Sequence, residues 1–64
     1  MKPSEFEIFM DPGYWDMWCL RKKSDKSFDN TLHFVKKTEA LHALQTICIW
    51  SGYTPTQEDF GELR

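Results

Sequence analysis

The fold is decided by residues 38–52, TEALHALQTICIWSG, the one stretch whose apolar side chains recur at helical spacing. Thr38 is a suitable helix start, and Gly52 is a suitable helix stop. With Leu44 at the centre of the apolar stripe and a rotation of about 100° per residue, five residues lie within about 60° of it: Ala40, Leu41, Ile47, Cys48 and Ser51. The spacing predicts an amphipathic helix over residues 39–51 with one face toward a core.

Two large apolar residues at the end of this helix do not fit the stripe. Ile49 falls near the opposite side of the helix, and Trp50 falls on the flank beside Ala43. Either the chain after the helix covers these two side chains, or they are exposed and offer an apolar surface to a partner.

Residues 14–23, YWDMWCLRKK, are predicted to form a strand that packs on the helix. Because side chains alternate along a strand, Trp15 and Cys19 share one face, whereas Trp18 and Leu20 share the other. Neither face is cleanly polar, which indicates a small sheet with apolar side chains on both sides.

A second strand is predicted over residues 31–37, TLHFVKK, antiparallel to the first and joined to it by the polar loop of residues 24–30. Residues 4–10 fit a helix and a strand equally well. Ser4 and Glu7 form a capping-box pattern. Alternation instead favours a strand with three apolar residues on one face: Phe6, Ile8 and Met10.

Two further segments contain turn signals. Residues 11–13, Asp-Pro-Gly, predict a turn, because proline presets φ and glycine tolerates the positive φ that commonly follows. In the tail, Thr54, Pro55 and Gln57 fit the N-cap, first and third positions of a short acidic helical turn that ends before Gly61. Two apolar tail residues are expected to fold back over Trp50 and Ile49: Phe60 and Leu63.

Together these elements predict one α+β domain over residues 1–64, a small antiparallel sheet packed on one helix. A chain of 64 residues buries a small fraction of its surface, so a single core is only marginally sufficient to keep it folded. Ten residues are Phe, Trp or Tyr, and each of these buries a large area. Aromatic side chains in excess of the core are candidates for a partner surface.

The charge is distributed in three blocks. Residues 1–17 carry one lysine and four carboxylates, residues 18–37 carry six cations and two carboxylates, and residues 38–64 carry one arginine and four carboxylates. The net charge of −2 argues against a general nucleic-acid binder, which usually has a basic total. A basic centre between acidic ends suits internal charge pairing or a polar partner surface.

No catalytic or metal-binding motif is present, and we predict neither an enzyme nor a cofactor. Cys19, His33, His42 and Cys48 have the residue types of a zinc site but not its spacing. A disulfide between the two cysteines is geometrically conceivable, but the absence of a signal-peptide pattern or a membrane-spanning run predicts a cytoplasmic protein. There, both thiols are expected to be reduced and buried.

The sharpest functional pattern is a pair of tryptophans interleaved with cations on the predicted hairpin. Trp15 and Trp18 precede a run of four basic residues: Arg21, Lys22, Lys23 and Lys26. Such a surface can stack bases and follow a phosphate backbone, which is typical of single-stranded nucleic-acid binding. The same residues can form an aromatic anchor with a basic rim against an acidic or mixed protein surface.

In order of elements, the chain resembles the small bacteriophage proteins that inhibit host RNA polymerase. The resemblance covers roughly residues 14–50 and rests on four pieces: Tyr14-Trp15, Trp18, residues 31–35, and Thr38-Glu39-Ala40-Leu41. That family follows its helix with another strand, whereas Pro55 and an acidic turn follow here. The resemblance implies a compact, aromatic protein that binds and blocks one host enzyme or defence component.

The sequence therefore predicts a non-enzymatic protein-binding module, a phage-encoded inhibitor or modulator of a bacterial host protein in the host cytoplasm, with no membrane partner. The expected partner-binding residues are Trp15, Trp18, Arg21, Lys22, Lys23 and Lys26, with Ile49 and Trp50 as a second choice. Two alternatives stay open. One is a single-stranded nucleic-acid binder using the same hairpin, and the other is a self-associating structural piece, such as a homodimer, joined through Trp50.

Overall fold

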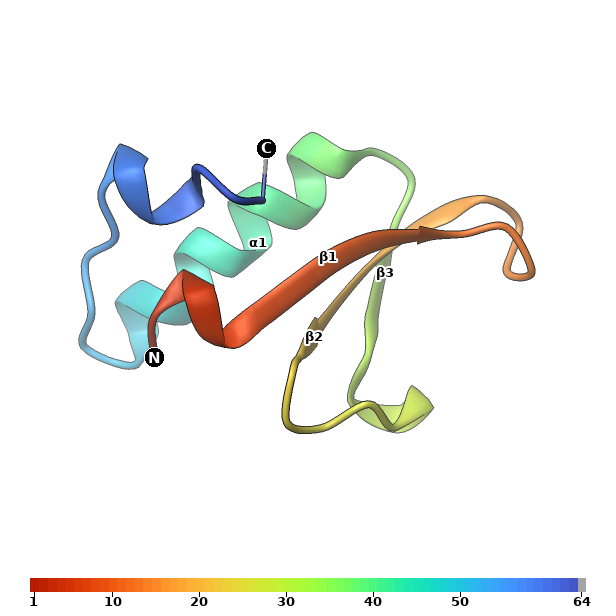
Figure 1. Cartoon of the computed structure of the whole chain (residues 1–64), viewed down its shortest axis with the longest axis horizontal. Coiled ribbons are helices and arrows are strands. Elements are labelled where there is room, and N and C mark those ends of the chain that lie inside the picture. The colour runs from red at the N-terminus through yellow and green to blue at the C-terminus, as the bar shows by residue number, and fades with distance from the viewer. Residues whose placement is uncertain (64) are drawn as a thin grey trace.

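The computed structural model describes residues 1–63, which contain three strands, one long helix and three short 3-10 helices. The predicted α+β architecture is confirmed: α1 lies across one face of an antiparallel sheet in the order β1-β2-β3 (Figure 1). The strands are β1 (Phe6–Asp11), β2 (Met17–Lys22) and β3 (Leu32–Phe34), and the helix is α1 (Lys37–Trp50). The 3-10 helices are η1 (Pro3–Glu5), η2 (Phe28–Asn30) and η3 (Gln57–Phe60).

The register of the sheet assigns each side chain to one of two faces. Leu20 of β2 pairs with Ile8 of β1 and with Leu32 of β3, and it packs against α1 in the core. Because side chains alternate, its neighbour Cys19 points to the other side of the sheet. We call the side of Leu20 the helix-covered face and the side of Cys19 the open face.

The N-terminal segment, for which the sequence fits a helix and a strand equally well, contains strand β1 from Phe6 onward. The predicted capping box between Ser4 and Glu7 does not form. Instead, the Glu5 carboxylate accepts a hydrogen bond of 2.6 Å from the Lys2 backbone N–H at the start of η1. The strand then begins at Phe6, whose side chain is buried.

Both predicted hairpin strands are shorter than expected. Residues 14–16 belong to a turn, so β2 begins at Met17. Lys37 already belongs to the helix, so β3 ends at Phe34. The antiparallel pairing of the two strands is as predicted.

The helix occupies residues close to those expected, with different caps. It begins at Lys37 because the Glu39 carboxylate accepts the Lys36 backbone N–H at 3.0 Å, so Thr38 is not the N-cap. The stop at Gly52 is confirmed. Gly52 has a φ of +92°, which favours glycine, and the next N–H, of Tyr53, donates to the Cys48 carbonyl at 2.9 Å.

The core lies between the helix-covered face and α1, and the tail completes it. The predicted stripe is confirmed at Ala40, Leu44 and Cys48, which are fully buried. Its other members are less covered: Leu41 and Ile47 are half-buried, and Ser51 is exposed. The tail prediction is wrong in its target, because Phe60 enters the core and leaves Ile49 and Trp50 exposed. The cap of η3 is Thr56 rather than Thr54. The buried cluster comprises Phe6, Leu20, Leu44, Cys48 and Phe60.

Candidate binding surfaces

The predicted hairpin site is divided by the fold. Trp18 shares the helix-covered face with Leu20 and is half-buried, with the Lys37 ammonium 5.5 Å from its ring centroid. Trp15 lies in the turn before β2 and is 81% exposed. Of the two tryptophans predicted as anchors, Trp15 alone is presented to solvent.

The turn of residues 12–16 holds Trp15 by backbone hydrogen bonds. The Asp11 carbonyl accepts the Tyr14 N–H at 3.1 Å, and the Tyr14 carbonyl accepts the Met17 N–H at 3.1 Å. Trp15 and Asp16, with φ of +53° and +56°, occupy the left-handed region that glycine and asparagine normally fill. The predicted turn is present, but its positive φ values fall on these residues and not on Gly13.

Beside this turn, three rings lie against one another on the open face. The centroid of the Tyr14 ring is 4.3 Å from that of His33 and 5.5 Å from that of Phe28, and the last two are 5.2 Å apart. Trp15 stands edge-on to Tyr14 at 4.9 Å. Cys19, which pairs with His33 in the sheet, is only 1% exposed. We call Tyr14, Trp15, Phe28 and His33 the aromatic cluster.

Arg21 is engaged within the molecule. Its guanidinium forms a salt bridge with the Glu7 carboxylate and lies 4.5 Å from the centroid of the Phe9 ring. Glu7 and Arg21 are directly opposite in the β1–β2 register, so their salt bridge links the two strands on the open face. Arg21 therefore does not act as a free cation at the rim of the predicted site.

The remaining predicted cations, Lys22, Lys23 and Lys26, are exposed. Lys22 and Lys23 lie at the far end of β2, and a strand of this length separates them from the Trp15 turn by roughly 17 Å. The structure therefore does not bring these two lysines beside Trp15.

The loop that carries these lysines is ordered by Asp25. Its carboxylate accepts the Ser27 hydroxyl at 2.8 Å, the Ser27 N–H at 3.1 Å and the Asn30 side-chain amide at 2.7 Å. The Ser27 hydroxyl is the largest cause of a lowered pKa of the Asp25 carboxyl, and Lys22 contributes less. The loop therefore keeps a defined shape with an ionised Asp25 at neutral pH.

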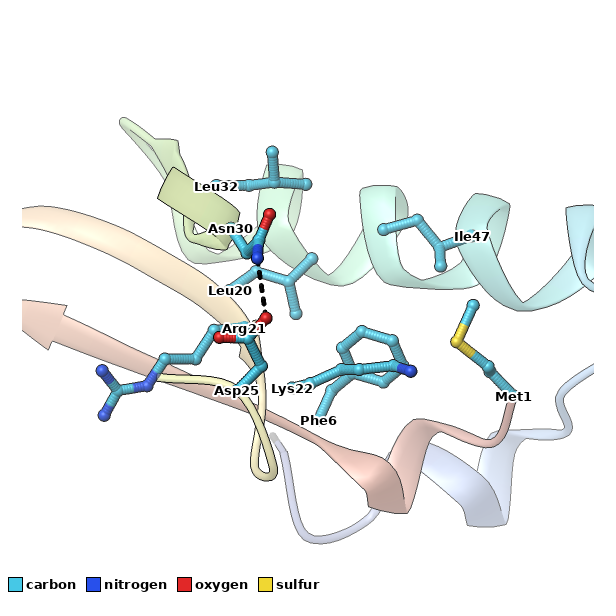
Figure 2. A pocket seen from close by; sticks show the side chains of 9 residues that line it. All are labelled: Met1, Phe6, Leu20, Arg21, Lys22, Asp25, Asn30, Leu32 and Ile47. Carbon is cyan, nitrogen blue, oxygen red and sulfur yellow. Dashed lines mark hydrogen bonds between the residues drawn. The ribbon is translucent and has the colours of Figure 1, made fainter. Parts of the chain in front are cut away.

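A pocket of about 210 Å³ opens between this loop, the sheet and α1. Phe6, Leu20, Leu32 and Ile47 supply apolar walls, and the Lys22 side chain runs along one side (Figure 2). Figure 2 also shows the Arg21 guanidinium directed away from this space. We call this pocket the basic groove.

The second predicted surface, at the end of α1, is exposed but not continuous. Trp50 is 85% exposed and Ile49 is half exposed. Trp50 is about 60° around the helix from Ile47, which lines the basic groove, so Trp50 lies toward that side of α1. Ile49 lies nearly opposite Ile47, on the same side of the helix as His42. A second pocket of about 270 Å³, between α1 and the tail, is lined by His42 and by polar residues such as Gln45 and Gln57.

The two cysteines are free and buried, as predicted. Burial raises the pKa of the Cys19 and Cys48 thiols, so both stay protonated at neutral pH. Within residues 1–63, no group of three side chains is placed to bind a metal ion. No helix among these residues is both long enough and apolar enough to cross a membrane.

Sequence reasoning missed the aromatic cluster and the basic groove as units. Phe28 gave a signal, since it is a lone aromatic in a polar loop. The sequence pattern places Tyr14 and His33 in two different strands, and strand alternation puts Tyr14 on the face of Trp18. The contact between Tyr14 and His33 depends on the left-handed turn, which the sequence does not indicate.

Comparisons with known proteins identify no relative: no family model, curated protein or solved structure matches the chain.

Proposed function

We propose that this protein is a small non-enzymatic module that binds another protein, acting as a phage-encoded inhibitor or modulator of a bacterial host protein. The order of elements, which resembles the phage inhibitors of RNA polymerase, supports the class. The aromatic cluster supports a binding role, because folded monomers rarely expose large contiguous apolar patches.

Trp15 is the single observation that carries the proposal. Its ring is 81% exposed, and its backbone occupies a left-handed conformation that costs about 1–2 kcal/mol for a residue other than glycine. Strained positions of this kind cluster at functional sites, and tryptophan is enriched among the residues that dominate binding energy. A bulky, strained and solvated Trp15 weakens the fold, so binding is the role that explains it.

The aromatic cluster provides the rest of the contact surface. Tyr14 supports Trp15 edge-on, and Phe28, which is 63% exposed, extends the apolar area along the open face. The carboxylates of Asp16 and Asp29 directly follow two of these rings in the chain. The expected partner offers an apolar cavity for Trp15 within a surface of mixed charge.

Single-stranded nucleic-acid binding has less support. Base stacking and phosphate contacts have to occur side by side along one strand. Here Tyr14 and Trp15 precede β2, whereas Lys22 and Lys23 lie at its far end. Asp16 and Asp29 neighbour the rings and repel phosphate.

The test uses a double variant, Trp15→Asn with Asp16→Gly, which places residues suited to positive φ in the turn. Tagged wild-type protein and variant are each mixed with nuclease-treated bacterial lysate and washed at low and at moderately high salt. One stoichiometric protein should be retained by the wild type at the higher salt and lost with the variant. Because the replacements relieve backbone strain, the variant should stay folded, and its thermal unfolding is measured alongside to exclude unfolding as the cause of lost binding.

Trp50→Gln is the matched control, since it removes the other highly exposed tryptophan from the far end of the molecule. It should retain the captured protein. Equal capture by wild type and the double variant would refute the role of Trp15. Recovery of nucleic acid alone would favour the strand-binding alternative. Self-association on a sizing column that Trp50→Glu abolishes would favour the structural alternative.

A further inference from the structure

We propose that the basic groove is a second binding site, which takes one large apolar side chain of an acidic peptide. The groove opens beside α1 on the helix-covered face, whereas the aromatic cluster lies on the open face. This proposal therefore goes beyond the proposed function and does not depend on Trp15.

The size of the groove fits one side chain. The groove is open to solvent and has a volume of about 210 Å³. An apolar cavity of about 150 Å³ holds a benzene ring, whereas sites for drug-sized molecules begin at about 300 Å³. A phenyl or branched aliphatic group therefore matches the space better than a larger ligand.

The walls of the groove favour an apolar group. Phe6 and Leu20 form its floor from two neighbouring strands, and Ile47 of α1 and Leu32 of β3 stand on opposite sides of the opening (Figure 2). Leu32 is 46% exposed although its strand neighbour Leu20 is buried. An inserted side chain would remove both Leu32 and Ile47 from water, which stabilises the complex by the hydrophobic effect.

The charge beside the groove selects an acidic peptide. The Lys22 side chain runs past Phe6 along the groove, and within residues 1–63 its ammonium forms no salt bridge. Lys23 and Lys26 follow on the same exposed loop. Carboxylates that flank an inserted side chain would meet the Lys22 ammonium, and Lys23 and Lys26 add positive charge outside the groove, which favours encounter.

The ionised Asp25 carboxylate also lines the groove, and it offsets part of this positive charge. Three donors, from Ser27 and Asn30, already engage its carboxylate. The Asn30–Asp25 bond closes the loop end of the groove, as Figure 2 shows. The groove is thus preorganised, so a ligand does not have to order the loop when it binds.

The test follows the methyl signals of Leu20, Leu32 and Ile47 by NMR while peptides are added to the full chain. The acidic probe is acetyl-Glu-Asp-Phe-Asp-Glu-amide, and its uncharged analogue is acetyl-Gln-Asn-Phe-Asn-Gln-amide. A third peptide, acetyl-Glu-Asp-Ala-Asp-Glu-amide, keeps the charge and lacks the ring. The acidic phenylalanine peptide should shift all three sets of methyl signals, the uncharged peptide should bind about fivefold more weakly, and the alanine peptide should leave the signals unchanged.

Lys22→Glu should remove the preference for the acidic peptide. The matched control is Lys23→Glu, which changes the net charge by the same amount at a neighbouring residue that does not line the groove. It should weaken binding less than Lys22→Glu does. Both positions are exposed, and Lys22→Gln repeats the test if charge reversal disturbs the fold.

Three results would overturn the proposal. They are unshifted Leu32 and Ile47 methyls with every peptide, equal affinity for the acidic and uncharged peptides, and equal effects of Lys22→Glu and Lys23→Glu. These experiments leave the aromatic cluster intact. A failure here therefore does not bear on Trp15, and loss of host-protein capture does not bear on the groove.

Discussion

The two faces of the sheet bury neighbouring residues in different ways. Leu20 and Cys19 are each 1% exposed, but Leu20 lies under a helix whose contacting residues, Leu44 and Cys48, are themselves buried. Cys19 lies on the open face, where the nearby rings are half-buried or exposed. A side chain between the helix-covered face and α1 can only stabilise the fold, whereas an exposed ring on the open face can also contact a partner. A buried residue can therefore be covered by side chains that are themselves available for binding.

The largest effect is expected for Leu44→Ala on the helix-covered face. Leu44 is fully buried, and loss of its side chain from a packed core destabilises a protein by about 2–5 kcal/mol. A domain this small has a free energy of unfolding of only a few kcal/mol. Urea denaturation followed by circular dichroism should show a largely unfolded variant. Gln45→Ala, at the exposed neighbour, should change stability by less than about 0.5 kcal/mol.

A smaller effect is expected for Tyr14→Ala on the open face. The variant loses ring contacts with Trp15, Phe28 and His33, each of which is worth about 0.5–1.5 kcal/mol when fully formed. Because these rings are partly solvated, we expect a loss of about 1–2 kcal/mol in total. Tyr14→Phe keeps the ring and should retain wild-type stability. A loss as large as that of Leu44→Ala would show that the open face carries a second core.

The double variant Trp15→Asn with Asp16→Gly should change stability in the opposite direction. Both residues occupy left-handed backbone, and the replacements relieve that strain, so a gain of about 1 kcal/mol is expected. Thermal unfolding of the two proteins measures it. Replacing only Asp16 with glycine should give part of the gain while Trp15 stays in place. A destabilised double variant would mean that the exposed indole contributes to the fold after all.

The helix-covered face was predictable from the sequence, and the open face was not. Ala40, Leu44 and Cys48 recur at helical spacing, so the pattern of the chain alone assigns them to the core. Helix spacing and strand alternation are local properties that each segment shows by itself. The α+β class and the antiparallel pairing of β2 with β3 follow from them.

The candidate site depends on turns, in which side chains do not alternate between two faces as they do along a strand. Had residues 14–16 continued the strand, Trp15 would share a face with Cys19, as the sequence predicts. The left-handed turn instead releases Trp15 into solvent and brings Tyr14 against His33. Likewise, the pairing of Arg21 with Glu7 requires the register of β1, a strand that the sequence left undecided.

The smallest effect is expected from pH, acting through Tyr53 and Asp59 in the tail that completes the core. The Tyr53 hydroxyl donates to the Asp59 carboxylate at 2.9 Å, and the Thr56 N–H donates to the same oxygen at 2.8 Å. These bonds hold η3 where Phe60 reaches the core. The Thr56 N–H, followed by the Tyr53 hydroxyl, lowers the pKa of the Asp59 carboxyl below 3.8. The bond to Asp59 raises the pKa of the Tyr53 phenol above 10.0.

The two pKa shifts predict that stability is constant over a middle range of pH and falls at both extremes. Because the Asp59 pKa is lowered on folding, its contribution is present above about pH 4 and is lost as the pH falls through the folded-state pKa. Because the Tyr53 pKa is raised, its contribution is present below about pH 10 and is lost as the pH rises through the folded-state value. The signals of Phe60 should therefore broaden or shift at both extremes of pH. Asp59→Asn should reduce the acid-side change, and Tyr53→Phe should remove the alkaline one. An acid-induced change that is the same in wild type and Asp59→Asn would assign the acid sensitivity to another carboxylate, such as Asp25 on its loop.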